Sequence, residues 1–327
     1  MKVSAFILSF NHTVKLIECV QSLLQQSCID EILVLENFST VQMEDTYRTL
    51  QDLSPIVQVN MASHPMSFSE GQNWGLDHAK NDLVLLMNND ARFIAPDSLQ
   101  SSVSILDNTP SIGLVGHKIY NLDGSLNHFG VDFNGLGDLD HFGRGDNGKN
   151  PQYSTIIECA AVTAACLLVR KTHLRFDTHY WFEFEDVDFC FQYLKADYRI
   201  VCNPACEVSH EESSSRGEIQ KVNYEWIGKQ SVGHRYFKKK WKSFYPEIRK
   251  KTLLFSLLKV KKFRFFRPHP TDLIFIMTCS IFLIYVDLFW HALLALAIAG
   301  IIRYLVVVLG YFCALIYLSL KKGINGV

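Results

Sequence analysis

Short apolar runs alternate with amphipathic stretches along the first ninety residues. Four of the runs have strand length and consist largely of Val, Leu and Ile: VSAFILS (3–9), EILVLE (31–36), IVQVN (56–60) and DLVLLMN (82–88). Apolar positions at helical spacing follow Thr13 and recur over 41–53 and 69–80. We expect Asn11 and Thr13 to supply the N-cap of the first helix. Near-continuous apolar strands separated by helices favour a parallel sheet covered on both faces.

The C-terminal part of the chain has a different pattern. Between residues 273 and 320 the charged residues are Asp287 and Arg303 alone, and basic runs stand before and after this stretch. It is long enough for two membrane spans of about 20 residues each. Because basic flanks stay in the cytoplasm, the pattern predicts a two-helix membrane hairpin over 271–327 with both ends on the cytoplasmic side. A hairpin that lies on the membrane surface or re-enters it is the alternative.

The segment before this hairpin, residues 216–270, is strongly basic. Its runs FKKKWK, EIRKK and KVKKFRFFRPH concentrate positive charge next to the apolar tail. This position favours a basic helical linker beside the membrane, and a solvated helix face is the alternative.

Composition excludes several other classes of protein. The net charge of −1 gives no field that favours nucleic acid. None of the nine cysteines forms a CxxC pair, which favours reduced thiols over a disulfide framework or a zinc site. The chain contains neither GxGxxG nor GxxxxGK[ST], which argues against dinucleotide oxidoreductases and P-loop enzymes.

Polar residues follow three of the predicted strands. They are Ser9 to His12 after the first strand, Glu36 to Ser39 after the second and Asn88 to Asp90 after the fourth. Ligands of parallel α/β sheets bind at the carboxyl ends of the strands, where these loops converge. The groups present there suit a nucleotide held by polar side chains together with a divalent ion.

A cluster of acids stands further along the chain, just before a predicted helix. It consists of Glu183, Glu185, Asp186 and Asp188. Acids near a helix N-terminus are stabilised by the backbone dipole, so simple capping is one interpretation. The cluster holds more carboxylates than capping needs, which favours a general base within it.

Five segments carry a resemblance to a known family. They are SFN (9–11), LVLENFST (33–40), FSEGQNWGLDHA (68–79), LLMNNDA (85–91) and the acid-rich stretch from 182 to 214. Their order and spacing resemble the inverting glycosyltransferases of family 2, and most closely the branch that includes bacterial rhamnosyltransferases. The resemblance covers residues 1–215. It implies an α/β GT-A fold, which is a Rossmann-like mixed sheet with helices on both faces, followed here by the linker and the membrane hairpin.

The resemblance also implies roles for particular residues. Asp186 would be the base that deprotonates the acceptor, with Glu185 and Asp188 as supports or acceptor contacts. Asp90 and His210 would hold Mg²⁺ or Mn²⁺. A histidine at the surface end of a strand is the alternative for His210. The expected contacts with the nucleotide sugar are Ser9, Asn11, Glu36, Asn37, Gly71, Asn73, Asn88, Asn89 and Asp90.

Two positions depart from the family pattern. Asn88 stands where the family's D-x-D motif begins with an acid, so it adds no charge and metal affinity is expected to be lower. Glu36 stands where the family has Asp; it would accept from the imide N–H of uridine or thymidine, unless it is a strand-end acid without a ligand. The Gly-rich segment 133–153 has no sustained period and is expected to form a mobile flap, from which Arg144 would meet the diphosphate.

Together these features predict a membrane-anchored glycosyltransferase. We expect it to move a sugar, with rhamnose among the candidates, from a dTDP- or UDP-sugar to a lipid-linked saccharide in bacterial surface polysaccharide synthesis. The hairpin would hold it at the cytoplasmic face of the inner membrane. The alternative is a catalytically silent subunit that binds sugar nucleotides and scaffolds a polysaccharide assembly complex. Asn88 and Glu36 favour the alternative, whereas the intact Glu185–Asp186 pair argues against it.

Overall fold

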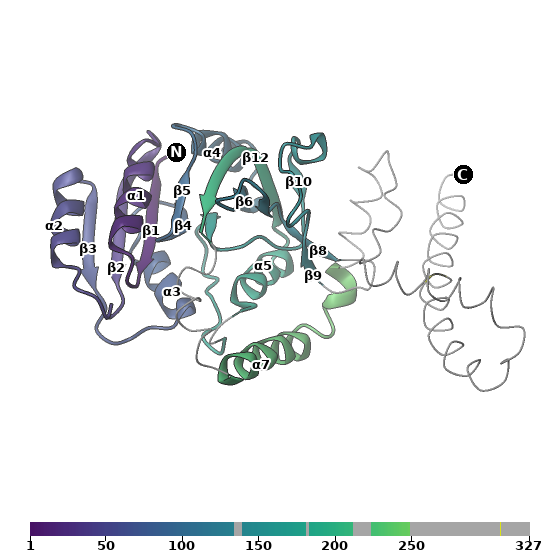
Figure 1. Ribbon diagram of the computed structural model, residues 1–327. Helices are drawn as coiled ribbons and strands as arrows, with labels where there is room; N and C mark the ends of the chain where they lie inside the picture. Colours follow the sequence, from purple (N-terminus) through teal and green to yellow (C-terminus); the bar gives the residue numbers. More distant parts are fainter. Residues whose placement is uncertain (134–138, 181–182, 212–223, 249–307, 309–327) are drawn as a thin grey trace, which may run out of the picture. The chain divides into compact units, whose positions relative to one another are not determined.

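The fold is built on one large mixed sheet with helices on both faces (Figure 1). The computed structural model describes residues 1–133, 139–180, 183–211, 224–248 and 308 of the 327-residue chain. The strands of the main sheet are β1 (Val3–Ser9), β2 (Ile29–Glu36), β3 (Val57–Met61), β4 (Leu83–Asn88), β5 (Ala91–Phe93), β6 (Ile112–Tyr120), β7 (Leu126–His128), β10 (Ile157–Glu158), β11 (Cys166–Arg170) and β12 (Arg199–His210). Strands β8 (Val131–Phe133) and β9 (Leu139–His141) form a separate pair. The helices are α1 (Thr13–Leu24), α2 (Glu44–Leu53), α3 (Phe68–His78), α4 (Leu99–Asn108), α5 (Glu185–Lys195) and α7 (Tyr224–Lys240), with a short 3₁₀ helix η1 (Pro151–Tyr153).

The strand order of the main sheet is β10-β12-β6-β11-β4-β1-β2-β3, with β5 paired to β12 and β7 to β6. Strands β1 to β4 are parallel, as the apolar runs predict. Strand β11 is antiparallel to both β4 and β6, so the parallel arrangement holds for β1 to β4 and the mixed sheet implied by the resemblance is confirmed. The run CLLVR of β11 is buried on both faces, and such a run does not reveal strand direction.

Side chains of β1 alternate between two cores. Ala5 and Ile7 face the core that includes α1 and α4, whereas Phe6 faces the core that includes α3 and α5. Helix α3 approaches the sheet closely because Gly75 lies against Phe6, where a Cβ would collide with the ring. Its N-terminus is fixed by a capping box, in which Ser67 and Glu70 exchange side-chain to backbone hydrogen bonds.

The starts of two helices differ from the sequence predictions. Neither Asn11 nor Thr13 caps α1: His12 precedes the helix in the left-handed conformation, with no side-chain cap. The Asn11 side chain accepts hydrogen bonds from Thr40 instead, which ties two loops together. Helix α5 begins at Glu185, so three of the four clustered acids lie inside its first turn.

The described part of the predicted flap is held by hydrogen bonds. The Phe142 amide donates to the Gly130 carbonyl at 2.9 Å, and the Leu126 amide donates to the Asp146 carbonyl at 2.8 Å. The Tyr153 hydroxyl donates to the Asp146 carboxylate at 2.5 Å. These bonds give residues 139–153 a defined structure, and the mobility of the predicted flap stays a prediction. Turns and side-chain bonds hold these residues, and neither produces a period in the sequence.

Helix α7 packs on the same compact unit as the sheet (Figure 1). Phe237 and Trp241 are buried against Phe191 of α5. The predicted boundary at residue 215 stays a prediction, but the described residues 224–248 contribute to the core.

No helix within the described residues is both long and apolar enough to span a membrane. The hairpin predicted over 271–327 lies outside the described part of the chain, except for Val308.

Candidate functional site

The carboxyl ends of β1, β2 and β4 lie at one level of the sheet. Ser9 is in register with Glu36 of β2, and Leu8 is in register with Asn88 of β4. The loops that follow are bonded to one another, since the Asn11 amide donates to the Ser39 hydroxyl at 2.8 Å. The three polar loops found in the sequence therefore meet at one edge.

Asp90 and His210 are brought together at this edge by the pairing of β5 with β12. His210 is in register with Ala91, the residue after Asp90. The His210 Nε2 lies 3.1 Å from Asp90 Oδ1 and 3.3 Å from Asn88 Nδ2. The side chains of His210 and Asp90 are only 10% and 9% exposed. Residues 120 positions apart in sequence thus form one buried cluster.

The donor set of this cluster fits a divalent cation. One imidazole nitrogen cannot donate a proton to Asp90 and accept one from Asn88 at the same time. A cation would instead accept electron pairs from both Nε2 and the carboxylate. The His210 Nδ1 is buried and has no hydrogen-bond partner within the described residues. Among those residues no group of three His, Cys, Asp or Glu side chains forms, so an ion here would need further ligands such as phosphate oxygens.

Asp186 lies in the first turn of α5, next to Glu185. Its Oδ1 accepts from the Val187 backbone amide at 2.7 Å, and Thr163 and Ala164 lie near enough to the carboxylate to lower its pKa. Removal from water raises the pKa of Asp186 above the ordinary aspartate value, and these hydrogen bonds oppose the rise. A carboxylate with a raised pKa is a stronger base, which suits proton abstraction.

The segment from Thr163 to Ala165 links Asp186 to the buried cluster. Thr163 and Ala164 lie beside the Asp186 carboxylate. The Ala165 carbonyl accepts from the backbone amide of Asn88 at 3.0 Å. Three consecutive residues therefore connect the two groups that the sequence predicted separately. Thr163 is absent from the predicted site. It is the single polar residue within the small apolar run AAVTAAC (160–166), and only that contrast would have indicated it.

Glu36 is buried at the end of β2, where it is 4% exposed. It accepts hydrogen bonds from the Ser39 amide at 2.5 Å and from the Tyr47 hydroxyl. Burial, followed by this bond to Glu36, raises the pKa of Tyr47. Glu36 therefore has partners within its own chain, and a nucleobase would have to replace or share one of them.

Three predicted contacts also serve the fold. The Asn37 amide group bonds the Met66 backbone in both directions, at 2.9 and 2.8 Å, and the Asn73 amide group does the same with Phe176, at 2.9 and 2.7 Å. Gly71 faces Leu8, where a Cβ would lie 2.6 Å from a methyl carbon. This packing contact gives the glycine a structural reason, and the predicted contact of Gly71 with the nucleotide sugar stays a prediction.

The two remaining predicted contacts are buried at the strand ends. The Asn89 side chain donates to the Phe10 carbonyl at 3.2 Å. The Ser9 hydroxyl has no hydrogen-bond partner within the described residues. Asn89 thus supports the loop after β1, and the predicted contact of Ser9 with the nucleotide sugar stays a prediction.

Positive backbone φ angles concentrate around this edge. Five of the seven non-glycine residues that have positive φ within the described chain lie here, namely Asn11 (55°), His12 (61°), Phe38 (57°), Glu183 (64°) and Phe184 (66°), and Asp97 and Asp197 are the other two. Each such conformation costs about 1–2 kcal/mol, so it persists only where its surroundings hold it. Strain of this kind is typical of functional sites, and here it lies in the loops after β1 and β2 and just before α5.

The family to which the chain belongs is decided by its sequence. The sequence profile described as Glycosyl transferase family 2 matches residues 4–171, which is more than half of the chain. The chain belongs to Glycosyl transferase family 2. The matched family 2 region contains Asp90 and Asn88 but ends before Asp186 and His210, so it does not test the roles of the latter two.

Two curated relatives resemble the family 2 chain. An uncharacterized protein, y4gI, from Sinorhizobium fredii is 28% identical over 226 residues, which cover 65% of this chain and 24% of the relative. The O-antigen biosynthesis protein RfbC from Myxococcus xanthus is 29% identical over 209 residues, which cover 60% of this chain and 16% of the relative. The family 2 chain therefore spans a quarter or less of each relative.

Two solved structures share the fold. GalNAc-T7, solved with UDP, GalNAc and Mn²⁺, matches with a TM-score of 0.54 and 13% identity over 64% of this chain and 44% of its own. The mannosyltransferase PcManGT from Pyrobaculum calidifontis, solved with GDP-Man and Mn²⁺, matches with a TM-score of 0.50 and 12% identity over 86% of this chain and 80% of its own. At these identities the likeness supports the α/β GT-A fold predicted from the sequence and nothing finer.

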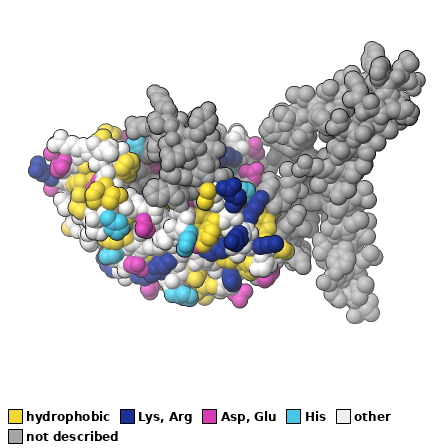
Figure 2. All heavy atoms as spheres, turned by 90° about the horizontal axis from the view of Figure 1, so that it is seen from below, with side chains coloured by type: hydrophobic (Ala, Val, Ile, Leu, Met, Phe, Trp, Pro, Cys, Tyr) yellow, Lys and Arg dark blue, Asp and Glu magenta, His cyan; other side chains and the backbone are white. Residues whose placement is uncertain are grey.

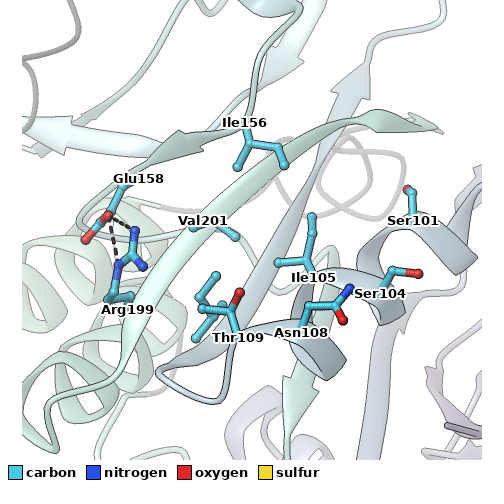
Figure 3. Close-up of a pocket in the computed structure, with 10 residues that line it drawn as sticks. Ser101, Ser104, Ile105, Asn108, Thr109, Ile156, Glu158, Arg199 and Val201 are labelled. Carbon is cyan, nitrogen blue, oxygen red and sulfur yellow. Dashed lines mark hydrogen bonds and ion pairs between the residues drawn. The ribbon is translucent and has the colours of Figure 1, made fainter.

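A pocket of about 390 Å³ lies at the opposite edge of the sheet (Figure 3). It is lined by the end of α4 and the starts of β6 and β12, including Ile112 and Val201. The ion pair between Glu158 and Arg199, at 2.7 Å, lies at one side of it. Because β6 runs parallel to β4, its first residues lie at the edge away from Asn88. The pocket is therefore separate from the Asp90 cluster.

We predict that Asn88→Asp strengthens metal binding at the Asp90 cluster. The new carboxylate would add a charged ligand within reach of His210, so less Mn²⁺ should be needed for half-maximal binding of UDP or dTDP. Calorimetric titration of nucleotide at a series of Mn²⁺ concentrations measures this. Gln51→Glu, which adds the same charge on exposed α2, is the control. An unchanged Mn²⁺ requirement in Asn88→Asp would show that the cluster does not hold the ion.

Proposed function

We propose that this family 2 chain is an inverting glycosyltransferase that moves one sugar from a nucleotide sugar to a lipid-linked saccharide in bacterial surface polysaccharide synthesis. One observation carries the proposal: a buried Asp90–His210 pair and a carboxylate of raised pKa, Asp186, are joined by Thr163 to Ala165 at one edge of the sheet. The name of the relative RfbC, an O-antigen biosynthesis protein, supports the choice of pathway.

The chemistry requires a base and a stabilised leaving group. The acceptor hydroxyl attacks the anomeric carbon of the donor, and Asp186 takes the hydroxyl proton as the bond to the nucleoside diphosphate breaks. Asp90 and His210 would hold a divalent cation, Mg²⁺ or Mn²⁺, which when bound neutralises charge on the departing diphosphate. The two structural neighbours solved with Mn²⁺ support a divalent cation of this kind. Thr163 and Ala164 orient the Asp186 carboxylate toward the acceptor.

The donor in this proposal carries uracil or thymine. Glu36 ends β2 at the level of Ser9, and its carboxylate can accept the imide N–H of either base once Tyr47 or Ser39 shares it. Cytosine and adenine have no N–H at the corresponding ring position and so cannot donate to Glu36. We therefore propose a dTDP- or UDP-sugar, with rhamnose among the candidate sugars.

The acceptor in this proposal is attached to a lipid, and the chain works at the cytoplasmic face of the inner membrane. Helix α7 exposes a row of basic side chains, Arg235 and Lys238, with Lys242 just beyond its end. Figure 2 views the molecule from the side of α7 and shows Lys and Arg side chains gathered there. Such a row is attracted by anionic headgroups. The apolar sequence from 273 to 320 would anchor the chain next to it.

Asp186→Asn is predicted to abolish sugar transfer while nucleotide binding stays within a few-fold. The amide cannot accept the proton, and loss of a general base typically costs a factor of about 10²–10⁴ in rate. Transfer assays with a panel of dTDP- and UDP-sugars, alongside thermal-shift titration of the nucleotide, measure the two effects. Asp52→Asn on exposed α2 is the matched control.

The pH profile gives a second readout of the same residue. Because the pKa of Asp186 is raised and the base works only when deprotonated, the rate should fall on acidification at a pH above the ordinary aspartate value of about 4. Normal turnover in Asp186→Asn would remove Asp186 from the mechanism. Nucleotide binding without turnover in the unmodified chain would instead identify a silent binding subunit.

We also predict that the full-length chain fractionates with bacterial inner membranes and resists extraction by alkaline carbonate. The apolar spans would hold it after the electrostatic contacts of α7 have been stripped away. Immunodetection of the fractions measures this, with a known peripheral protein as control. Complete release by carbonate would mean that the C-terminal segment does not span the bilayer.

A further inference from the structure

Helix α7 and the residue after it contact the chain on both sides of Asp186. Two residues before Asp186, the Phe184 ring stacks on His234 at 4.8 Å between centroids and lies 5.1 Å from the Phe237 ring. Two residues after Asp186, the Asp188 carboxylate is bonded by Lys240 and Trp241. The segment that carries the proposed base is therefore held at two points by one element.

Asp188 is fully buried, with 0% exposure, and its charge is compensated by four side chains. Its donors are the Tyr180 hydroxyl at 3.1 Å, the Trp241 Nε1 at 2.6 Å, the Gln192 amide at 2.9 Å and Lys240 Nζ at 2.9 Å from each oxygen. Removing the charged partner of a buried carboxylate strongly destabilises the folded protein. Of these four donors only Gln192 belongs to α5, and only Lys240 carries a positive charge.

Lys240 is shared with a second carboxylate. Its Nζ lies 2.5 Å from Asp177, which also accepts from the Tyr236 hydroxyl at 3.0 Å. Burial alone would raise the pKa of Asp177, but the hydrogen bonds from Lys240, His179 and Tyr236 outweigh it and hold the pKa well below the ordinary value. Burial likewise opposes the charge on Lys240, and the two carboxylates more than offset it, so the pKa of Lys240 is raised. Lys240 is thus a fixed cation between α5 and the loop that precedes it.

Aromatic packing accompanies these charges. The Phe191 ring of α5 lies 5.0 Å from Phe237 and 5.5 Å from Trp241. Phe237 is 1% exposed and Trp241 is 5% exposed. The contact therefore resembles a part of the domain core more than a transient surface association.

The backbone next to Asp186 needs such support. Glu183 and Phe184 both have positive φ, a conformation that returns to extended or helical geometry unless its side chains are held. Release of either contact point would move the first turn of α5, and with it the Asp186 carboxylate.

We propose that the end of α7 positions the base: Lys240 and Trp241 act on Asp186 through Asp188, and His234 and Phe237 act on it through Phe184. The inference rests on the proposed role of Asp186 as the base. Lys240 and Trp241 are positioning residues, and the family 2 site is incomplete without a segment that follows it in sequence.

The test compares Lys240→Met, Lys240→Arg and Lys239→Met in the full chain. The readout is release of dTDP from dTDP-rhamnose and of UDP from UDP-glucose with Mn²⁺, resolved into kcat and KM. Lys240→Met should lower kcat about tenfold or more with KM within about twofold, because a small misplacement of a catalytic group is costly. Lys240→Arg should restore most of kcat. Lys239→Met, at the exposed neighbouring position, should leave kcat and KM unchanged.

Hydrogen exchange of the amides from 183 to 190 provides a readout that needs no substrate. Exchange should be faster in Lys240→Met and unchanged in Lys239→Met. If Lys240→Met does not fold, Trp241→Phe takes its place. It keeps an aromatic ring and loses the hydrogen-bond donor to Asp188, and its exchange should also be faster. Unchanged exchange together with a wild-type kcat in Lys240→Met or Trp241→Phe would overturn the proposal. If instead Asp186→Asn keeps full turnover, the assignment of the base fails, while the exchange result still decides whether α7 holds this segment.

Discussion

The pairing of β12 with β5 is the contact on which the candidate site depends. Strand β12 runs beside β6 for most of its length, and its register shifts between Asn203 and Glu207. This shift includes Pro204, which has no amide to donate to the ladder. Beyond it, β12 pairs with β5, and His210 comes to lie beside Asp90. Without this pairing the edge would carry only one acid and two amides after β4, which is too weak a donor set for a divalent cation.

A second constraint is that the carboxylates in the first turn of α5 have different partners and different roles. Asp188 is fully buried and is bonded by a cation, Lys240, so its contacts hold the structure together. Asp186, two residues earlier, is held by neutral donors alone, and its pKa is raised. Two acids on one turn thus have different partners, which is the physical basis for assigning the base to one of them. The helix dipole stabilises both carboxylates, so it does not distinguish between them.

The sequence predicted well those features that depend on local pattern. Apolar runs of strand length located β1 to β4 to within two residues, and the polar residues after them converge as expected. The resemblance to family 2 supplied the mixed sheet, which periodicity alone did not, because β11 is buried on both faces and carries no sign of its direction. The proximity of Asp90 and His210 followed from the same resemblance, since no local rule pairs residues 120 positions apart.

Features that depend on tertiary contacts were missed. Thr163 is an isolated polar residue whose importance lies in its contact with Asp186, and no periodicity indicates that contact. The sequence of segment 139–153 predicts a flap because the turns and side-chain hydrogen bonds that hold it produce no periodic pattern. From the sequence, Lys240 is one of several lysines in a basic run, whereas the structure gives it two carboxylate partners, Asp177 and Asp188. A crystal structure with Mn²⁺ and UDP or dTDP tests the central claim most directly. The account predicts an anomalous manganese peak bonded to Asp90 and His210, with the diphosphate on its far side. A manganese peak elsewhere, or a nucleotide in the pocket beside Arg199, would contradict it.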